Sequence, residues 1–478
     1  MTVLFPALHT APAKPALRFG DRTLGYAELA GVAGALAHDL RSRAPGRVAV
    51  WATAGMETSV AVVAALLAGV PAIPVNPKIG ERELAHIVAD SEPALVLTEP
   101  GANLPAALDA LPRKDVTLTG TAGELPEEPG DEAPALIVYT SGTTGPPKGA
   151  VLPRRAIAST LDALEDAWQW TADDVLVHAL PLFHVHGLIL GILGPLRRGG
   201  TVHHIGRFST EAIARELGGE ATMMFGVPTM YHRIAGEVNA SGELARALRG
   251  ARLLVSGSAA LPVRDHRLIT AATGQQVIER YGMTETLMNT SVRADGERRP
   301  GTVGVPLPGV RLRLVDDDGR TIETSDGETV GEIQVRGPNL FSGYLNRPDA
   351  TAEAFDDGWF RTGDMATRDA DGYVRIVGRK ATDLIKSGGY KIGAGEIENA
   401  LLEHPGVAEV AVTGEPDEDL GERIVAWIVA DGEPPAEREL TDHVAKLLSP
   451  HKRPRIVRYL DSLPRNDMGK VLKRSLDA

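Results

Sequence analysis

Hydroxyl, glycine and lysine residues crowd into one short run between Ile137 and Gly149, which reads IVYTSGTTGPPKG. Glycines let backbone amides approach phosphate oxygens closely, hydroxyls donate hydrogen bonds, and a lysine supplies positive charge. The Gly-x-x-x-x-Gly-Lys-Ser/Thr spacing of a P-loop ATPase is absent. The competing interpretation, a surface turn with a solvated lysine, is disfavoured by so long and particular a run. The sequence therefore predicts a phosphate-binding loop, with these candidates: Thr140, Ser141, Gly142, Thr143, Thr144, Gly145 and Lys148.

Four later segments also combine residue types that suit chemistry on a nucleotide. Arg280–Thr286 (RYGMTET) places an aromatic ring, which can stack, near a carboxylate, which can bind a metal. Trp359–Asp364 (WFRTGD) ends in a carboxylate with two acceptor oxygens. Asp383–Tyr390 (DLIKSGGY) carries paired glycines, and Pro464–Lys473 (PRNDMGKVLK) carries flexible cationic side chains. Taken singly, each has an ordinary alternative: a surface glutamate, a turn or a frayed basic terminus.

Together and in this order, the five segments closely resemble the motifs of the adenylate-forming superfamily, which includes acyl-CoA synthetases, luciferases and peptide-synthetase adenylation domains. The resemblance covers nearly the whole chain. It implies an enzyme that uses ATP and Mg²⁺ to convert a carboxylic acid to an acyl-adenylate, and then passes the acyl group to the thiol of coenzyme A. A catalytically silent relative that binds nucleotide is the alternative from a different functional class.

The resemblance also implies a role for each motif residue. Lys470 would bridge the acyl carboxylate and the α-phosphate, with Lys473 as the competing candidate. Tyr281 would stack on adenine, Asp364 would bind the ribose hydroxyls, and Arg379 would reach the nucleotide. The other nucleotide or coenzyme A contacts would be Ser258, Ala259, Arg280, Gly282, Met283, Ser387, Gly388 and Gly389. Glu285 and Thr140 would hold the metal, and Thr284 and His184 would join Lys470 and Glu285 in catalysis.

The acyl pocket of the family corresponds to segments that here contain polar and cationic residues. A long-chain fatty-acid tunnel would be lined mainly by apolar groups, so a small polar acid is favoured. The second carboxylate of a dicarboxylate must be paired on burial, and arginine can bind it through two hydrogen bonds. We expect Arg233 to bind it, with Arg280 as second choice. The pocket candidates are His184, Val185, His186, Arg233, Ser258, Arg280 and Met283.

The segments HVHG, GVPTMYHR, RYGMTETLMN and IKSGGYKI each resemble those of malonyl-CoA synthetases, which also accept methylmalonate. This likeness implies that malonate or methylmalonate is the substrate. Another small or aromatic acid is the open alternative. For Arg233, the alternative is an ordinary salt bridge on an exposed helix face.

Composition excludes several other functions. The 478 residues carry a net charge of -13, which disfavours binding to nucleic acid or anionic membranes. There is no cysteine, so a cysteine nucleophile, a thiolate metal site and disulfides are excluded. No apolar run reaches a membrane-spanning length, and the first residues lack the pattern of a signal peptide, so we expect a cytoplasmic protein. The sequence does not indicate an oligomeric state.

Hydrophobic periodicity outlines the fold that must position these residues. Short β-branched runs alternate with helical periods from Arg47 to Leu97, and again from Ala135 to Tyr281, which predicts two α/β units joined by a solvated linker at 120–132. Residues 301–378 favour a small β-rich unit, and the tail favours an α+β domain. We therefore predict a large N-terminal domain, 1–378, and a small mobile C-terminal domain, 379–478. The hinge would be Lys380 or Ala381.

Overall fold

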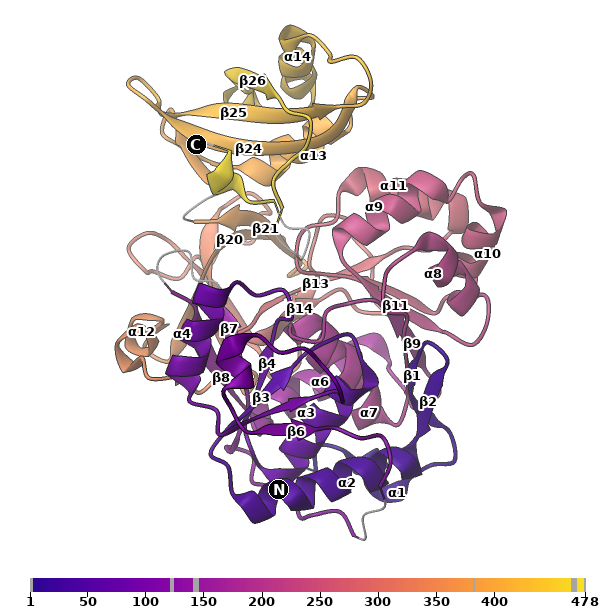
Figure 1. The fold of residues 1–478 in the computed structure, drawn as a ribbon. Helices are drawn as coiled ribbons and strands as arrows, with labels where there is room; N and C mark the ends of the chain where they lie inside the picture. The colour runs from indigo at the N-terminus through magenta and orange to yellow at the C-terminus, as the bar shows by residue number, and fades with distance from the viewer. Residues whose placement is uncertain (1–2, 121–123, 141–145, 381–382, 466–470, 477–478) are drawn as a thin grey trace.

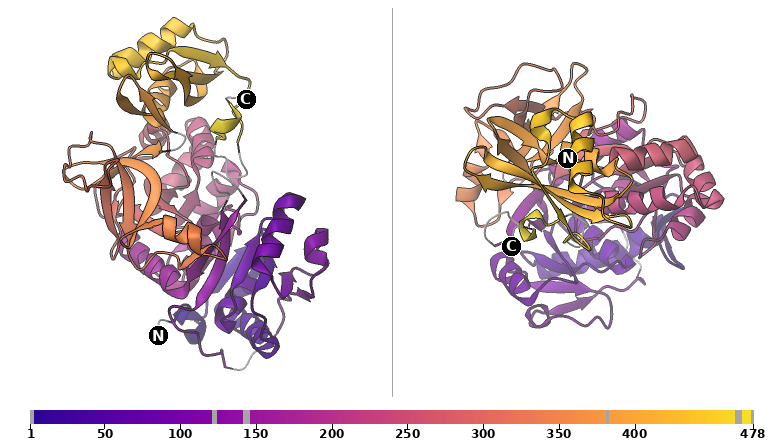
Figure 2. Two further views of the ribbon diagram at one scale, coloured as in Figure 1. Left: turned by 90° about the vertical axis from the view of Figure 1, so that its left-hand side faces the viewer. Right: turned by 90° about the horizontal axis from the view of Figure 1, so that it is seen from above.

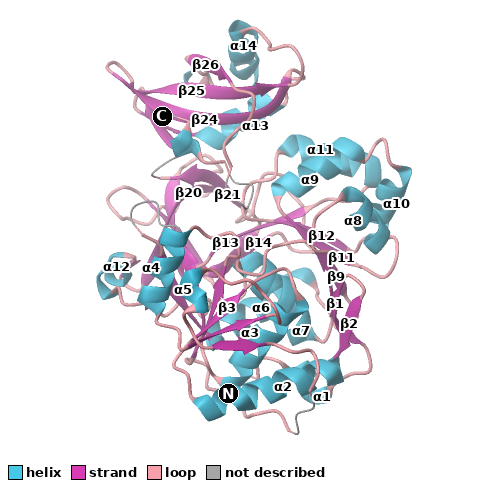
Figure 3. Cartoon of the chain, viewed as in Figure 1, coloured by secondary structure: helices cyan, strands magenta, loops and turns pink. Residues whose placement is uncertain are grey.

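Four β-sheets organise the chain in the computed structural model, which describes residues 3–120, 124–140, 146–380, 383–465 and 471–476. Two sheets have helices on their faces, a third is antiparallel, and the fourth belongs to a small C-terminal unit (Figures 1 and 3). This arrangement confirms the predicted α/β architecture with a small α+β C-terminal unit. None of the helices in the described part of the chain has the length and apolar character that a bilayer crossing requires.

The first α/β sheet has seven strands, of which β3 to β6 run parallel. In spatial order they are β18 (Gly343–Tyr344), β8 (Lys148–Pro153), β7 (Pro134–Thr140), β4 (Ala72–Val75), β3 (Val48–Trp51), β5 (Leu95–Thr98) and β6 (Arg113–Asp115). Its helices are α2 (Tyr26–Arg43), α3 (Met56–Ala68), α4 (Glu81–Ser91), α5 (Ala106–Asp109) and α6 (Arg154–Trp168).

The second sheet has nine strands and a parallel centre. In spatial order they are β15 (Val305–Pro306), β14 (Leu287–Ser291), β13 (Ile278–Met283), β12 (Leu253–Ser256), β11 (Met223–Gly226), β9 (Val175–His178), β10 (Thr201–His204), β1 (Pro15–Phe19) and β2 (Arg22–Gly25). Its helices are α1 (Pro6–Thr10), α7 (Gly194–Arg198), α8 (Thr210–Leu217), α9 (Pro228–Glu237), α10 (Gly242–Gly250) and α11 (Val263–Thr273), with a π-helix at His186–Leu193.

Two sequence predictions about these sheets were wrong. The strand at Ala135–Tyr139 belongs to the first sheet, where β7 pairs with β4, and not to the second unit. The segment 120–132 is not simply a solvated linker, because Glu128 within it is buried. The Glu128 carboxylate accepts the backbone N–H of Leu4 at 2.8 Å and forms an ion pair with the buried Arg154. Burial lowers the pKa of Arg154 to about 10, and the pair fixes this segment against the N-terminal residues.

Helix α3 shows why the two α/β units form one body. Its sequence, METSVAVVAALLA, is apolar on nearly every side, and all residues from Met56 to Leu67 are buried. A helix that is hydrophobic all round belongs in the interior rather than on one surface. It contacts β3, β4 and β5 of the first sheet and β1 of the second. The shared core between the sheets therefore includes this helix. Figure 2 shows the small C-terminal unit, coloured orange to yellow, at one end of the molecule.

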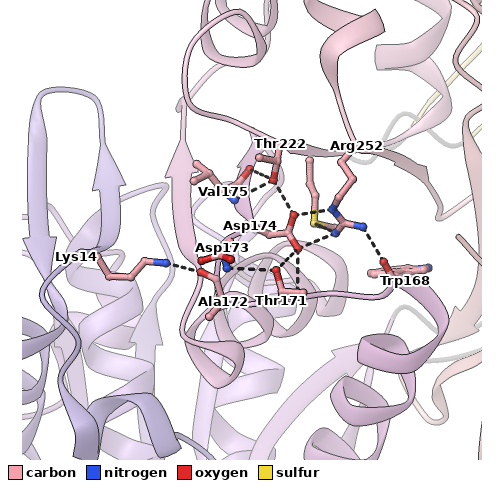
Figure 4. Close-up of polar contacts among 10 residues, drawn as sticks. Lys14, Trp168, Thr171, Ala172, Asp173, Asp174, Val175, Thr222 and Arg252 are labelled. Carbon is pink, nitrogen blue, oxygen red and sulfur yellow. Dashed lines mark hydrogen bonds and ion pairs between the residues drawn. The ribbon is translucent and has the colours of Figure 1, made fainter.

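A buried carboxylate ties together the starts of neighbouring strands in the second sheet (Figure 4). Asp174, which precedes β9, accepts hydrogen bonds from Arg252 Nε and Nη2, both at 2.7 Å. It also accepts the Thr222 hydroxyl at 2.8 Å and the Thr171 backbone N–H at 2.9 Å. Because Thr222 precedes β11 and Arg252 precedes β12, the cluster fixes three strands at their amino ends and leaves their carboxyl ends to carry other side chains.

The third sheet is antiparallel and confirms the predicted β-rich unit. It contains β16 (Arg311–Val315), β17 (Gly331–Arg336), β20 (Trp359–Arg368), β19 (Phe355–Asp356) and β21 (Val374–Arg379), with α12 (Pro348–Glu353) nearby. The chain then enters the C-terminal sheet, formed by β23 (Tyr390–Gly393), β22 (Leu384–Ser387), β25 (Gly421–Ala430), β24 (Val407–Asp417) and β26 (Ile456–Tyr459). Helices α13 (Ala394–Leu402) and α14 (Glu437–Leu447) pack with this sheet.

The C-terminal unit contacts the second sheet's helices through α11 and α13 (Figure 1). Arg264 of α11 donates to the backbone carbonyls of Leu402 and Val407, each at 3.4 Å. Arg267 lies 3.4 Å from the carboxylate of Glu403. Since Leu402 is the last residue of α13, the two arginines face the negative end of that helix.

Candidate active site

Four of the predicted pocket segments leave the carboxyl ends of neighbouring strands in the second sheet. Residues 181–187 follow β9, residues 227–233 follow β11, residues 257–261 follow β12, and residues 280–286 include the end of β13. Ligands of open α/β sheets bind in the crevice outside the carboxyl ends of the strands. The fold therefore gathers segments that are up to 105 positions apart in the chain, from 181 to 286, at one edge.

Arg280 is a buried cation at this edge, with 5% of its surface exposed. Its Nε and Nη2 atoms have no hydrogen-bond partner among the residues that the structure describes. Burial lowers the pKa of the guanidinium to about 10, so it stays positive at neutral pH. Gly257 provides the space, because a Cβ at that position would lie 2.3 Å from Arg280 Cζ. Burying a cation whose N–H groups have no acceptor costs free energy. A bound anion would offset that cost, because it pairs with the charge and accepts the hydrogen bonds.

The π-helix places a buried histidine ring, which when neutral has one donor and one acceptor nitrogen, beside Arg280. His186 begins this helix, is 3% exposed, and has no partner at either ring nitrogen within the described chain. Burial, followed by the charge of Arg280, lowers the pKa of His186 well below its usual value, so the ring is neutral. Val185 is buried and His184 is partly buried, with the His184 and Phe183 ring centroids 4.5 Å apart. The pair Arg280 and His186 suits a small bound anion.

Arg233 and the segment after β12 lie nearer to the surface. Arg233 is exposed on α9 and forms no ion pair with any described residue, so the alternative interpretation, a salt bridge on a helix face, is not seen there. Its neighbour His232 pairs with the buried Asp265 at 3.1 Å. Ser258 and Ala259 are exposed, and Ser258 has a φ of 78°, a left-handed conformation that is uncommon for a residue other than glycine. Such outliers concentrate at binding sites.

One tyrosine joins the phosphate-loop lysine to the predicted metal ligand. The Lys148 Nζ lies 4.3 Å from the centre of the Tyr344 ring. The Tyr344 hydroxyl donates to Glu285 Oε1 at 2.8 Å. Glu285 is buried, and burial together with this carboxylate raises the pKa of Tyr344, which keeps its proton. Thr284 and Met283 are partly buried beside it, whereas Ser141, Gly142, Thr143, Thr144 and Gly145 lie outside the described residues.

A second cluster joins the predicted adenine and ribose residues to Arg379, the arginine that was predicted to reach the nucleotide. The Tyr281 hydroxyl donates to Asp364 Oδ2 at 2.6 Å. Arg379 Nε lies 2.8 Å from Asp364 Oδ1, and the two residues are paired across β20 and β21. Burial, then the charge of Asp364, raises the pKa of Tyr281, so its hydroxyl is a donor. A carboxylate with two acceptor oxygens is the kind of group that suits the two hydroxyls of a ribose.

The glycine motif forms the tip of a hairpin in the C-terminal unit. Gly388 and Gly389 connect β22 to β23 with φ values of 58° and 83°, the positive values that a two-residue hairpin turn requires. Ser387, just before the turn, is buried. Tyr390, just after it, is 54% exposed and stacks on His451 with ring centroids 4.0 Å apart. The turn is therefore narrow, has no side chain of its own, and has a flat aromatic surface next to it.

The structure describes only one of the two candidate lysines near the C-terminus. Lys470 lies outside the described residues. Lys473 is paired with Asp383 at 3.0 Å and with Glu398 at 2.8 Å. Although burial disfavours its charge, these two carboxylates raise the pKa of Lys473. A lysine committed to two carboxylates is a poor candidate for gripping a reacting phosphate.

Several residues of this region were missed by sequence reasoning. Tyr344 and His451 belong to no recognised motif, and Gly257 was not singled out within the predicted pocket segment that contains it; the roles of all three depend on contacts with residues far away in the chain. Within its segment, Gly257 lies between two serines after a predicted strand. That pattern predicts a turn, but it does not reveal that Arg280 fills the space above it.

Comparison with known proteins gives a consistent set of matches. The model of the AMP-binding enzyme family matches residues 5–345, and that of the AMP-binding enzyme C-terminal domain matches residues 396–470. A malonate–CoA ligase of Arabidopsis thaliana is 38% identical over 475 residues, which cover 90% of this chain and 77% of the relative. The predicted phosphate-loop residues 140–148 lie in the first matched region and Lys470 lies in the second, whereas Asp364 and Arg379 lie between the two.

Two solved structures resemble the chain along nearly its whole length. A malonyl-CoA ligase, in a ternary product complex with methylmalonyl-CoA and AMP, is 72% identical, covers 96% of this chain and 100% of its own, and has a TM-score of 0.76. ATP-bound MatB from Rhodopseudomonas palustris is 36% identical, covers 99% of this chain and 97% of its own, and has a TM-score of 0.90. The more identical chain has the lower TM-score of the two. The chain belongs to the AMP-binding enzyme family.

Proposed function

We propose that this enzyme ligates malonate or methylmalonate to coenzyme A, with ATP converted to AMP and pyrophosphate through an acyl-adenylate. It is an AMP-forming acid–thiol ligase that uses a small carboxylic acid, ATP and coenzyme A. The observation that carries the choice of acid is the buried guanidinium of Arg280, whose Nε and Nη2 have no hydrogen-bond partner among the described residues. The likeness to malonate–CoA ligases and to a methylmalonyl-CoA complex supports the same choice.

The charge of the acyl pocket selects a dianion over a simple fatty acid. One carboxylate of malonate must stay free to react, so the other has to be buried with a counter-charge. Arg280 has two unused donors for it, and neutral His186 can add a third. Arg233, exposed at the rim on α9, could bind the same carboxylate or attract it from solvent. An acid without a second anionic group leaves the guanidinium unpaired, which costs affinity.

In the first half-reaction the free carboxylate attacks the α-phosphorus and pyrophosphate leaves. Asp364, Tyr281 and Arg379 would hold the ribose and adenine, since their hydroxyl, carboxylate and guanidinium already form one cluster. Lys148 and the loop from Thr140 onward would bind the leaving phosphates. Lys470 would neutralise the charge that develops at the α-phosphate. Substitution of each of these residues, with the rate of adenylate formation as the readout, would test its assigned role.

The residues present fit a magnesium ion. Within the described chain no group of three His, Cys, Asp or Glu residues could hold a metal. Magnesium in nucleotide enzymes uses one or two carboxylates and completes its shell with water and substrate phosphates. Glu285, buried beside Lys148 and Tyr344, supplies such a carboxylate, and Thr140 could add a hydroxyl. The ion would offset phosphate charge while Lys148 and the loop bind the same phosphates.

In the second half-reaction the thiol of coenzyme A replaces AMP on the acyl group. We propose that the Gly388–Gly389 turn lines the path of the thiol, because no side chain blocks it. The stacked rings of Tyr390 and His451 offer a surface for the adenine of coenzyme A. Both lie beyond Arg379, so rotation of a C-terminal domain, 379–478, about Lys380 or Ala381 would let it serve the two steps in turn.

An acid panel tests the proposed function. Purified enzyme is assayed for AMP and pyrophosphate with malonate, methylmalonate, acetate, butyrate and benzoate. Malonate or methylmalonate should exceed the monocarboxylates in kcat/KM, and Arg280→Ala should lower that advantage by about 10–100-fold, the cost of one charged hydrogen-bonded pair. Arg233→Ala should have a smaller effect. Release of ADP instead of AMP, or an undiminished preference for malonate in both variants, would refute the assignment.

Cytoplasmic location remains a prediction, supported by the use of ATP and coenzyme A as co-substrates. Cell fractionation with an antibody to the protein would test it.

A further inference from the structure

Helix α4 contacts the phosphate-loop region from outside the nucleotide site. His86 and Asp90 are four residues apart on this helix, so their side chains lie on the same face, one turn from each other. That face is turned toward β7 and β8, the two strands that the loop connects. Neither residue belongs to a motif, and neither is among the groups placed around the nucleotide above.

Asp90 holds the strand that leads into the loop. The Tyr139 hydroxyl donates to Asp90 Oδ2 at 2.6 Å, and Tyr139 directly precedes Thr140. Burial, followed by the hydrogen bond and charge of Asp90, raises the pKa of Tyr139, so the hydroxyl keeps its proton and remains a donor. This contact fixes the end of β7 relative to α4.

His86 holds the chain where it leaves the loop. Its Nε2 lies 2.8 Å from the carbonyl oxygen of Pro147, the residue before Lys148. A carbonyl can only accept, so Nε2 must carry the proton. The His86 ring also meets the Tyr139 ring edge to face, with centroids 6.5 Å apart. One helix therefore contacts both ends of the loop.

Asp90 also reaches the strand that carries Tyr344. The Asn346 side-chain amide donates to the Asp90 backbone carbonyl at 2.8 Å and to its Oδ1 at 3.3 Å. Asn346 adopts a left-handed conformation, with φ of 53°, just after β18. Two residues earlier, Tyr344 contacts both Lys148 and Glu285. Asp90 thus connects the entry of the phosphate loop to the lysine and carboxylate that face the phosphates.

We propose that His86 and Asp90 are positioning residues for adenylation, which fix the two ends of the phosphate loop and the Tyr344 strand in one geometry. They act through Tyr139, Pro147 and Asn346 and do not touch ATP. The inference rests on the proposed function, because it assumes that the loop binds the phosphates of ATP. It predicts a defect confined to the half-reaction in which pyrophosphate leaves.

The experiment compares Asp90→Ala, Tyr139→Phe, their double variant and His86→Ala with the wild-type enzyme. Malonate-dependent pyrophosphate exchange should lose about 10–100-fold in kcat/KM for ATP, the scale expected when a reacting group is displaced by about 1 Å. Thioester formation from supplied malonyl-adenylate and coenzyme A should change by less than about twofold. Because Asp90 and Tyr139 share one contact, the double variant should be no worse than the poorer single variant.

Glu83→Ala is the matched control, since Glu83 is exposed on the same helix. It should leave both half-reactions unchanged. Equal losses in both half-reactions, accompanied by a lower melting temperature, would show that α4 is merely structural and would overturn the proposal. So would full exchange activity in Tyr139→Phe, which removes only one oxygen and is the variant least able to disturb folding. Absence of AMP formation by the wild-type enzyme would instead refute the proposed function.

Discussion

At the scale of single residues, Gly257 controls whether Arg280 can take its buried position. A Cβ at position 257 would lie 2.3 Å from Arg280 Cζ, but it would meet only the far end of a flexible side chain. Gly257→Ala should therefore displace the guanidinium without unfolding the protein. We expect kcat/KM for malonate to fall by about 10–100-fold, as for loss of a charged hydrogen bond, with KM for ATP nearly unchanged.

Gly236→Ala is the control for that variant, because a Cβ at position 236 of α9 would meet no atom within 4 Å. It should leave malonate turnover intact and stabilise the protein by up to about 1 kcal/mol, since alanine is the better helix former. Steady-state kinetics with each substrate varied, together with thermal melting, would check both. If Gly257→Ala kept wild-type malonate kinetics, the added Cβ would not displace the Arg280 guanidinium, and the prediction would be wrong.

The sequence motifs were enough to name many of the candidate site residues, but they did not predict which of these residues contact one another. The aromatic ring and the carboxylates of Tyr281, Glu285 and Asp364 could be named from type and order alone. The structure adds that Tyr281 and Asp364 share a hydrogen bond and that Tyr344 joins Glu285 to Lys148. These partners are distant in sequence, and no local pattern records a contact of that kind.

At the scale of elements, the Asp174 cluster is expected to govern how firmly the second sheet holds together. Asp174 is 3% exposed and depends on Arg252 for two of its hydrogen bonds. Arg252→Ala leaves a buried carboxylate without its counter-ion, which typically costs about 3–5 kcal/mol. We expect a destabilisation near the lower end of that range, because the Arg252 side chain is itself 36% exposed. Denaturant unfolding would measure it.

Arg293 offers a comparison in the same protein, because it also pairs with two carboxylates, Asp166 and Asp295, but at the surface. Surface ion pairs contribute about 0–1 kcal/mol, so Arg293→Ala should lose no more than that. If Arg252→Ala and Arg293→Ala lost the same free energy of unfolding, the burial of Asp174 would not increase the value of its ion pair, and the prediction would be wrong.

The elements themselves were largely predictable, but their partners were not. Hydrophobic periodicity located β9 to β13 to within a few residues, because a buried parallel strand is a short apolar run, and it indicated two of the five C-terminal strands, β24 and β25. Nothing local indicates that β7 pairs with β4 or that β1 pairs with β10. Sheet partners are chosen by tertiary packing, which explains why Ala135–Tyr139 was placed in the wrong unit.

At the scale of the whole molecule, the contact between α11 and α13 should bias the enzyme toward the arrangement seen here, which superposes well on ATP-bound MatB. Arg267→Glu would place like charges at the contact with Glu403. Since exposed pairs contribute about 1 kcal/mol or less, we expect a loss of at most about fivefold in pyrophosphate exchange, with thioester formation from supplied adenylate spared.

The exchanged pair Arg267→Glu with Glu403→Arg restores opposite charges and should recover the exchange rate. Recovery would identify the pair as the cause, whereas an equal loss in the double variant would show that the contact does not bias the domain arrangement. Both half-reactions must be measured on the same preparations for this comparison.

The hairpin of β1 and β2 has a consequence for how the chain is made. These strands are synthesised well before β10, yet Leu17 of β1 pairs with Val202 of β10, so the hairpin waits for more than 180 further residues before its partner strand exists. Until then its hydrogen-bonding edge and its apolar Leu17 and Phe19 are open to other nascent chains. We therefore expect the pairing of β1 with β10, which completes this sheet, to be the slowest and most chaperone-dependent step of biosynthesis.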